Sequence, residues 1–385
     1  MAIRTLVLSG GGGRGAFHAG VYSYLMKRDK PGVADSHSGP WDPQIVVGTS
    51  IGAVNGAAIT QGIRPEALEQ FWLSLTEQDI QGLPPGMGWL ARRVANMILR
   101  PAIGTSLPHV KENSMSPPVS QSWPPIPVLP RGISERLIGR WSNLLDTGPL
   151  HRTMVERLGI DEAEIADSDK VLLISATNVR TGEAVIFSNR DVIDPRTQQT
   201  YDYCKPKITT RRIIASCSIP MMYPWTQDED GAIYWDGAVV ANTPLGPAFD
   251  VMENEDQTNG KDKKEPVEAV VVMMTPWWES GERAPECDDL PQDFGEAITW
   301  TLDWALLASF RRDLKLARAY NKVAKMAMSA GDDPDFRLFN DIIVAPEKFL
   351  DVTRIIDYDR EGSEKLIKAG YEAAERAFQR QFPAT

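Results

Sequence analysis

The sequence predicts an α/β fold of three layers (α/β/α), in which a mostly parallel central sheet is covered by helices on both faces. Short apolar runs alternate along the chain with segments whose apolar residues recur at helical spacing, and this alternation is typical of α/β proteins. Residues 267–274 are almost continuously apolar, which indicates a strand buried on both faces. The chain is long enough to bury a large core, and we expect one domain over residues 1–385.

The individual elements follow from the same patterns. Residues 5–9 form the first predicted strand, and a glycine loop at 10–15 leads into a helix over 16–25. Further strands are expected at residues 45–47, 171–178, 183–187, 233–238, 267–274 and 338–345. Further helices are expected at residues 51–59, 66–75, 89–99, 207–218, 294–322 and 361–379. Residues 290–385 are expected to be a C-terminal helical extension packed on the body.

One stretch, residues 82–132, departs from this alternation. It is rich in proline and serine between residues 101 and 130, and proline fits neither a helix interior nor a central strand because it lacks the backbone N–H. We therefore expect a lid or loop insertion over the body. A tolerated surface insertion would explain the composition equally well.

Charge and composition limit the classes of partner. The net charge of −11, from 41 basic and 52 acidic side chains, argues against nucleic-acid binding and disfavours strong electrostatic docking to anionic membranes, although a local basic patch could remain. No run is long enough to span a membrane, and the N-terminal apolar run is too short for a signal peptide. The three cysteines form no C-x-x-C motif, so we expect a cytoplasmic protein, peripheral at the membrane at most. No pair of histidines has ligand spacing, and no metal or other cofactor is expected.

The clearest chemical motif is Gly48-Thr49-Ser50-Ile51-Gly52, between an apolar strand and a helix. A G-x-S-x-G turn of this kind is a nucleophile elbow, which lifts the serine hydroxyl clear of the sheet. Both glycines are needed because a Cβ at either position would clash with the neighbouring strand or helix. An ordinary βα turn that contains a serine is the alternative.

The glycine loop at residues 10–15 allows two interpretations. Gly10, Gly12 and Gly15 satisfy the dinucleotide-binding pattern G-x-G-x-x-G. A glycine-rich loop at a helix N-terminus also presents several open N–H groups and can form an oxyanion hole. A dinucleotide site would need an acidic residue at the end of the next strand, but Asp35 lies in a loop and that strand ends at the serine. The oxyanion hole is therefore favoured.

Asp236 is the candidate for a base. No histidine follows His151, which excludes a triad in the chain order Ser, Asp, His. An aspartate acting directly on the serine is possible if burial raises its pKa, and Asp236 lies between Trp235 and Gly237 at a strand end. An aspartate that caps its own turn is the alternative.

Taken together, these motifs resemble the patatin-like phospholipases, lipid acyl hydrolases that use a Ser-Asp dyad. The family pattern G-G-G-x-R/K-G matches Gly10–Gly15, G-x-S-x-G matches Gly48–Gly52, and D-G-G/A matches Asp236–Ala238. Further matches lie at Asn242-x-Pro244, Ala215–Pro220 with Tyr223-Pro224, Ala176–Asn178 before Thr181-Gly182, and Gly370-Tyr371. The resemblance covers most of the chain except roughly residues 82–140 and implies a patatin-like fold.

The resemblance implies a role for each matched residue. Ser50 would be the nucleophile, Asp236 the base, and the N–H groups of Gly11, Gly12 and Gly13 the oxyanion hole. Arg14 matches a position that neutralises a substrate phosphate in some relatives, although it could instead hold the glycine loop through a carboxylate or carbonyl. The implied substrate is an acyl lipid or ester, met at a membrane or micelle surface. Met221-Met222, Trp277-Trp278 and the proline-rich insertion could form an apolar rim.

Other functions stay open on the sequence alone. The same dyad could serve an acyltransferase or thioesterase, since an acyl-enzyme can react with acceptors other than water. A dinucleotide-binding protein would use Gly10–Gly15 but would leave Ser50 and Asp236 without a role. A catalytically silent partner protein is disfavoured by the intact set of motif residues.

Overall fold

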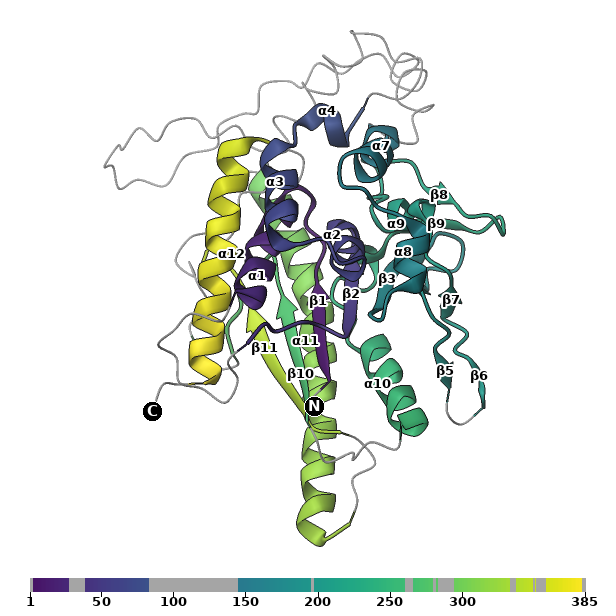
Figure 1. The fold of residues 1–385 in the computed structure, drawn as a ribbon, viewed down its shortest axis with the longest axis vertical. Coiled ribbons are helices and arrows are strands. Elements are labelled where there is room, and N and C mark those ends of the chain that lie inside the picture. The colour runs from purple at the N-terminus through teal and green to yellow at the C-terminus, as the bar shows by residue number, and fades with distance from the viewer. Residues whose placement is uncertain are drawn as a thin grey trace, which may run out of the picture.

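The computed structural model describes residues 3–27, 39–82, 145–194, 197–259, 266–279, 282, 294–332, 337–348, 350 and 358–382. A mostly parallel sheet with helices on both faces forms the body (Figure 1), which confirms the predicted fold class. The predicted helix over 89–99 and all of the predicted lid except Gly82 lie outside the described residues. Residues 290–385 contribute two long helices and also a strand of the central sheet.

The central sheet has nine strands within the described residues. They are β1 (Arg4–Leu8), β2 (Ile45–Thr49), β3 (Val171–Asn178), β4 (Ala184–Ser188), β7 (Cys204–Pro206), β8 (Thr226–Gln227), β9 (Ile233–Asp236), β10 (Val267–Val272) and β11 (Phe339–Val344). The order is β11-β10-β1-β2-β3-β4-β7, and the first five of these strands are mutually parallel. Both β4 and β9 run antiparallel to β3, and β8 pairs with β9. The short strands β5 (Ile193–Asp194) and β6 (Gln199–Thr200) form a separate pair.

The described residues also form ten α-helices and two short 3₁₀ turns. The helices are α1 (Ala16–Met26), α2 (Ile51–Thr60), α3 (Pro65–Ser74), α4 (Glu77–Ile80), α7 (Gly148–Glu156), α8 (Glu162–Asp167), α9 (Thr210–Ser216), α10 (Gly246–Asn259), α11 (Phe294–Ala330) and α12 (Arg360–Gln381). The 3₁₀ turns are η1 (Gly12–Gly15) and η2 (Gly237–Val239). α9 begins three residues later than predicted because Lys207 has a positive φ of 78°, whereas α11 continues to Ala330, beyond the predicted end.

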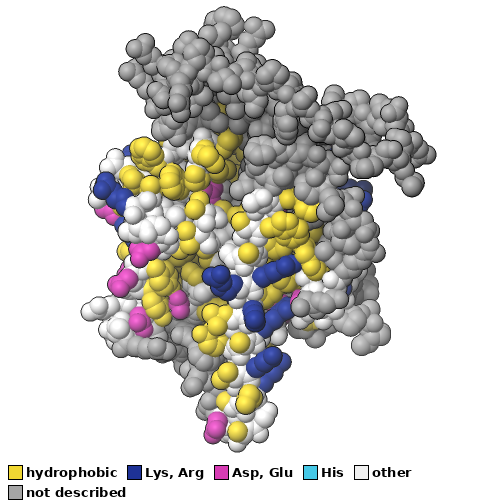
Figure 2. Space-filling model, turned by 180° about the vertical axis from the view of Figure 1, so that it is seen from behind, with side chains coloured by type: hydrophobic (Ala, Val, Ile, Leu, Met, Phe, Trp, Pro, Cys, Tyr) yellow, Lys and Arg dark blue, Asp and Glu magenta, His cyan; other side chains and the backbone are white. Residues whose placement is uncertain are grey.

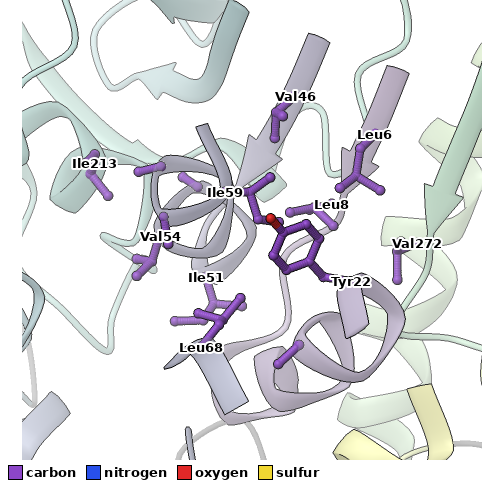
Figure 3. Packing of buried hydrophobic residues seen from close by; sticks show 14 of the residues in the cluster. Leu6, Leu8, Tyr22, Val46, Ile51, Val54, Ile59, Leu68, Ile213 and Val272 are labelled. Atoms are coloured by element: carbon purple, nitrogen blue, oxygen red, sulfur yellow. The ribbon is translucent and has the colours of Figure 1, made fainter. Parts of the chain in front are cut away.

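Two hydrophobic cores lie on opposite faces of the sheet, because successive residues of a strand point to opposite sides. Leu6 and Leu8 of β1 belong to the first core, which packs against α1, α2, α3 and α12, whereas Val7 belongs to the second, which packs against α10 and α11. Figure 3 shows the first core, where residues of β1, β2 and β10 meet α1, α2, α3 and α9. The predicted strand over 267–274 is buried on both faces as β10.

No helix in the described part of the chain is both long enough and apolar enough to cross a membrane.

Candidate active site

Ser50 stands at the sharp turn between β2 and α2. Its backbone has φ 55° and ψ −128°, a conformation that costs a non-glycine residue about 1–3 kcal/mol. The Ser50 N–H donates to the Ser216 hydroxyl at 2.8 Å, and the Ala53 N–H donates to the Ser50 carbonyl at 2.8 Å. The Ser216 hydroxyl donates in turn to the Ser175 carbonyl at 2.6 Å, which ties the turn to β3. The predicted strand, turn and helix are confirmed, and Ser50 is buried at the turn.

Gly48 and Gly52 allow the backbone to pass through this turn. A Cβ at Gly48 would lie 2.4 Å from the carbonyl oxygen of Gly52, and one at Gly52 would lie 2.3 Å from the carbonyl oxygen of Leu8. Both distances are too short for any side chain, because the obstructing atoms belong to the backbone. The predicted crowding at the two glycines is therefore confirmed.

The register of the sheet brings Asp236 next to Ser50. Thr49, the last residue of β2, pairs with Ser175 of β3, and Asp236, the last residue of β9, pairs with Ala176, the next residue of β3. Because β4 occupies the other edge of β3, β9 lies on the edge used by β2 and meets it end to end. The serine and the aspartate, 186 positions apart in sequence, thus meet at one point of the sheet.

The Asp236 carboxyl is buried, and only one of its two oxygens accepts a hydrogen bond from a described residue. Its Oδ1 accepts a hydrogen bond from the Ala238 N–H at 2.8 Å, so Asp236 also caps η2, as the alternative interpretation expected. Its Oδ2 is buried, and no described residue donates to it within 3.5 Å. Burial raises the pKa of Asp236 to about 7, from an ordinary value of 3.8, although the nearby Ser50 hydroxyl and the Ala238 N–H lower it. Near neutral pH the carboxyl can therefore take up or release a proton.

Neither described histidine contacts the pair. His18 is completely buried, and its Nδ1 lies 3.2 Å from the side-chain nitrogen of Asn55. Burial lowers the pKa of His18 to about 3, so the ring is neutral near pH 7. His151 lies 3.3 Å from the Thr210 hydroxyl. Among the described residues, it is thus Asp236, and not a histidine, that lies next to Ser50.

The glycine loop lies directly beside the serine. A Cβ at Gly10 would lie 3.0 Å from the Ser50 Cβ, and the Gly10 N–H donates to Asn242 Oδ1 at 2.8 Å in a buried hydrogen bond. The Arg14 N–H donates to the Gly11 carbonyl at 3.2 Å. Between these two anchored positions, no acceptor among the described residues takes a hydrogen bond from the N–H groups of Gly11–Gly13. The loop therefore presents unsatisfied donors next to Ser50.

Arg14 is buried and has partners within the protein. Its guanidinium lies 3.4 Å from the Asp303 carboxylate of α11 and donates to the Leu350 carbonyl at 3.1 Å, while Nε is buried without a partner among the described residues. Burial raises the pKa of Asp303, and the charge of Arg14 opposes this rise. These contacts match the alternative interpretation, in which Arg14 holds the glycine loop. Its predicted contact with a substrate phosphate stays a prediction.

Asn55 is a site residue that the sequence patterns did not identify. Its amide nitrogen donates to the Gly15 carbonyl at 3.0 Å, and its Oδ1 accepts from Trp72 Nε1 at 3.0 Å. Through these bonds α2 and α3 hold the C-terminal end of the glycine loop. A single amide inside the apolar helix that follows Ser50 was the available signal, because a buried amide needs partners. Ser216 was missed because its partners lie far away in sequence.

Comparison with known proteins identifies the family to which the chain belongs. The model of the family described as patatin-like phospholipase matches residues 6–249, more than half of the chain. The crystal structure of VipD from Legionella pneumophila is similar with a TM-score of 0.42 and 13% sequence identity, over 98% of this chain and 67% of that chain. A search of curated protein sequences found no match. From the family match, the chain belongs to the patatin-like phospholipase family, which implies a lipid acyl hydrolase, broadly of the esterase type, that acts on a lipid or ester substrate.

Proposed function

We propose that the protein cleaves carboxylic ester bonds of phospholipids or other acyl lipids with Ser50 as the nucleophile and Asp236 as the base. The observation that carries this proposal is the buried Asp236 carboxyl, with a pKa near 7, beside a serine at a strained strand-to-helix turn. A carboxylate with an ordinary pKa is a weak base for an alcohol, and burial removes much of that mismatch. Family membership supports the same chemistry.

The reaction follows from the positions of these groups. The Ser50 hydroxyl gives its proton to Asp236 Oδ2 as its oxygen attacks the ester carbonyl carbon. The N–H groups of Gly11, Gly12 and Gly13 stabilise the resulting oxyanion. The bond to the alcohol then breaks, and Asp236 returns the proton to the leaving oxygen. In the second half, water gives a proton to Asp236 and attacks the acyl-enzyme, and the fatty acid leaves as Ser50 regains its proton.

Apolar side chains exposed on both segments that flank Asp236 favour an acyl substrate. Met221 and Trp225 lie on the loop after α9, and Val239 and Val240 follow Asp236 in sequence. The Ser218 carbonyl accepts from the Asp236 N–H at 2.9 Å, so that loop adjoins the carboxyl-bearing strand. Apolar side chains exposed on these two segments are suited to contact an acyl chain.

Trp277 and Trp278, which the sequence also suggested for an apolar rim, are half-buried against α11. Trp277 packs edge-to-face on Phe310 and Trp278 on Trp304, both on α11. These contacts join the segment after β10 to α11, and a place of the two rings at the rim stays a prediction.

A fluorophosphonate probe tests the proposed nucleophile. The expected result is a single adduct on Ser50, located by peptide mass spectrometry, with no adduct on Ser50→Ala. A panel of phospholipids, lysophospholipids and simple esters then identifies the substrate. Ser50→Ala and Asp236→Asn should each lower kcat by at least about a thousandfold with the fold intact by circular dichroism. Full activity in either variant contradicts the dyad.

A further inference from the structure

The outer face of α11 exposes a stripe of apolar side chains. Leu316, Tyr320, Val323 and Met326 are 54%, 40%, 53% and 72% exposed. Their spacing of four, three and three residues places them on one side of the helix. The opposite side is buried in the second core through residues such as Phe310 and Leu314. In Figure 1 the C-terminal end of α11 extends beyond the other labelled elements of the body, so the last part of this stripe lies on a projecting surface.

A row of cations runs along one flank of the apolar stripe. Arg311, Lys315, Arg318, Lys322 and Lys325 follow at steps of four, three, four and three residues, which aligns them on the helix. Figure 2 shows basic side chains beside apolar ones on this part of the surface. No acidic residue occurs between residues 314 and 330.

Two of these cations have partners among the described residues, and the other three have none there. Arg318 pairs with Glu279 and Asp341, and Arg311 lies over the Trp278 ring at 4.4 Å. Among the described residues, no carboxylate lies within 4.0 Å of the ammonium groups of Lys315, Lys322 or Lys325. The lysines are therefore available to an external anion.

This local pattern contrasts with the charge of the whole chain. The net charge is −11, so a helical stretch that carries four cations and no acidic residue between 314 and 330 is locally basic. An apolar stripe flanked by lysine and arginine is the arrangement of helices that lie in the interface of anionic membranes. A second copy fits less well, because antiparallel pairing of two such helices would set one row of cations against the other.

We propose that the outer face of α11, residues 311–326, docks the protein on membranes that contain anionic lipids. The apolar side chains enter the boundary between headgroups and acyl chains, and the lysines contact the headgroup phosphates. The choice of a lipid surface rests on the proposed function, whereas the pattern of charge and exposure is independent of it. The inner side of the same helix carries Asp303, the partner of Arg14, so the docking helix also supports the glycine loop.

Vesicle cosedimentation tests the docking face. The full-length Ser50→Ala protein, in which the proposed nucleophile is removed, is mixed with vesicles of phosphatidylcholine alone or with an equal part of phosphatidylglycerol. We expect binding to the anionic vesicles only, weakened by added salt. Lys322→Gln with Lys325→Gln should weaken it about 30-fold, from about fivefold per cation. Val323→Gln with Met326→Gln should weaken it at least about fivefold.

Control variants on other helices distinguish a loss of binding by the outer face of α11 from a general effect of removing a lysine or an apolar side chain. Lys365→Gln with Lys368→Gln removes two exposed lysines at the same spacing from α12 and should change binding by less than about twofold. Val155→Gln on α7 is the apolar control. Equal losses in the two lysine pairs, or equal binding to both kinds of vesicle, would overturn the proposal. So would absent vesicle binding together with a dimer in analytical ultracentrifugation that Met326→Gln dissociates, since the occupant would then be a second copy.

Hydrolysis of a water-soluble ester distinguishes this proposal from the proposed function. The protein with native Ser50 and its Lys322→Gln/Lys325→Gln variant should hydrolyse the soluble ester at equal rates. Docking without any ester hydrolysis would overturn the proposed function alone, and hydrolysis without docking would overturn the docking face alone.

Discussion

At the scale of single residues, the burial of Asp236 favours the proposed catalysis but lowers the stability of the folded protein. The residue is 2% exposed, and its carboxyl has one buried oxygen without a donor among the described residues. Burial that raises the pKa makes the carboxylate a better base, but it also makes the charged form costly in the folded protein. Two predictions follow from the same pKa, one for activity and one for stability.

The first prediction concerns the pH dependence of activity. If Asp236 is the base, kcat/KM for a monomeric ester should rise as pH increases through about 7 and then level off, because the base must be deprotonated in the free enzyme. A monomeric substrate is needed so that docking on an interface does not add its own pH dependence. A midpoint near 4 would show that the base has an ordinary carboxyl pKa.

The second prediction concerns stability. Asp236 has a pKa near 7 in the folded state and about 3.9 in the unfolded state, so the folded protein holds the extra proton between these values. The free energy of unfolding therefore falls as pH rises through this window, and the penalty is complete above pH 7. Asp236→Asn removes the charge and keeps the Oδ1 acceptor for the Ala238 N–H.

Asp236→Asn should thus be more stable than the parent protein at pH 8, by about 4 kcal/mol at most, and the gain should vanish near pH 4. Urea unfolding at several pH values measures this difference. A variant that is less stable at pH 8 would show that the carboxylate has charged partners in the folded state.

Residue patterns identified the candidates that belong to short motifs. Ser50, Asp236 and Gly11–Gly13 were predicted because an elbow, a D-G turn and a glycine block are local in sequence. Asn55 was not, because its role depends on the Gly15 carbonyl and the Trp72 ring, which only the fold brings to it.

At the scale of elements, the contact between α1 and α12 depends on two glycines. A Cβ at Gly20 would lie 1.9 Å from the Ile367 carbonyl oxygen, and a Cβ at Gly370 would lie 2.1 Å from that of Phe17. The backbones of the two helices therefore touch. Figure 1 shows α12, in yellow, beside α1.

The third prediction is that Gly20→Ala destabilises the protein by about 3 kcal/mol despite the better helix propensity of alanine, because the helices must separate. Thermal unfolding measures the loss. Gly246→Ala is the control, since no atom lies within 4 Å of the added Cβ, and its effect should be small. If the two variants were equally stable, α12 could move away from α1 without a loss of free energy of unfolding.

Long periodic elements were predicted better than short ones. The pattern over 294–322 predicted α11 but not its last eight residues, where Val323 and Met326 are exposed and follow the outer face rather than the buried one. The short strand β8 was not predicted because two residues have no period, and it is formed through its pairing with β9.

At the scale of the whole molecule, the site is assembled across the sheet. The parallel order of β1, β2 and β3 agrees with the predicted alternation of strands and helices. β9 pairs antiparallel with β3 next to the end of β2. This pairing could not be predicted, because the register between strands that are distant in sequence produces no local sequence pattern. That register is nevertheless what brings Asp236 to Ser50.

The last prediction separates the support of the site from the stability of the body. Phe310 is completely buried in the second core, on the face of the sheet covered by α11, whereas Asn242 binds the Gly10 N–H beside Ser50. Phe310→Ala should lower the free energy of unfolding by about 3–5 kcal/mol because it leaves a cavity. At a temperature where the variant stays folded, its kcat should match that of the parent protein.

Asn242→Ala should show the opposite pattern. Losing one buried acceptor costs about 1–3 kcal/mol, but kcat should fall at least about tenfold because the glycine loop is no longer held against Ser50. Urea unfolding measures stability, and fluorophosphonate titration counts the active molecules so that kcat refers to folded protein. If kcat fell equally in both variants, activity would follow global stability. The position of the glycine loop would then not be the property that Asn242 controls.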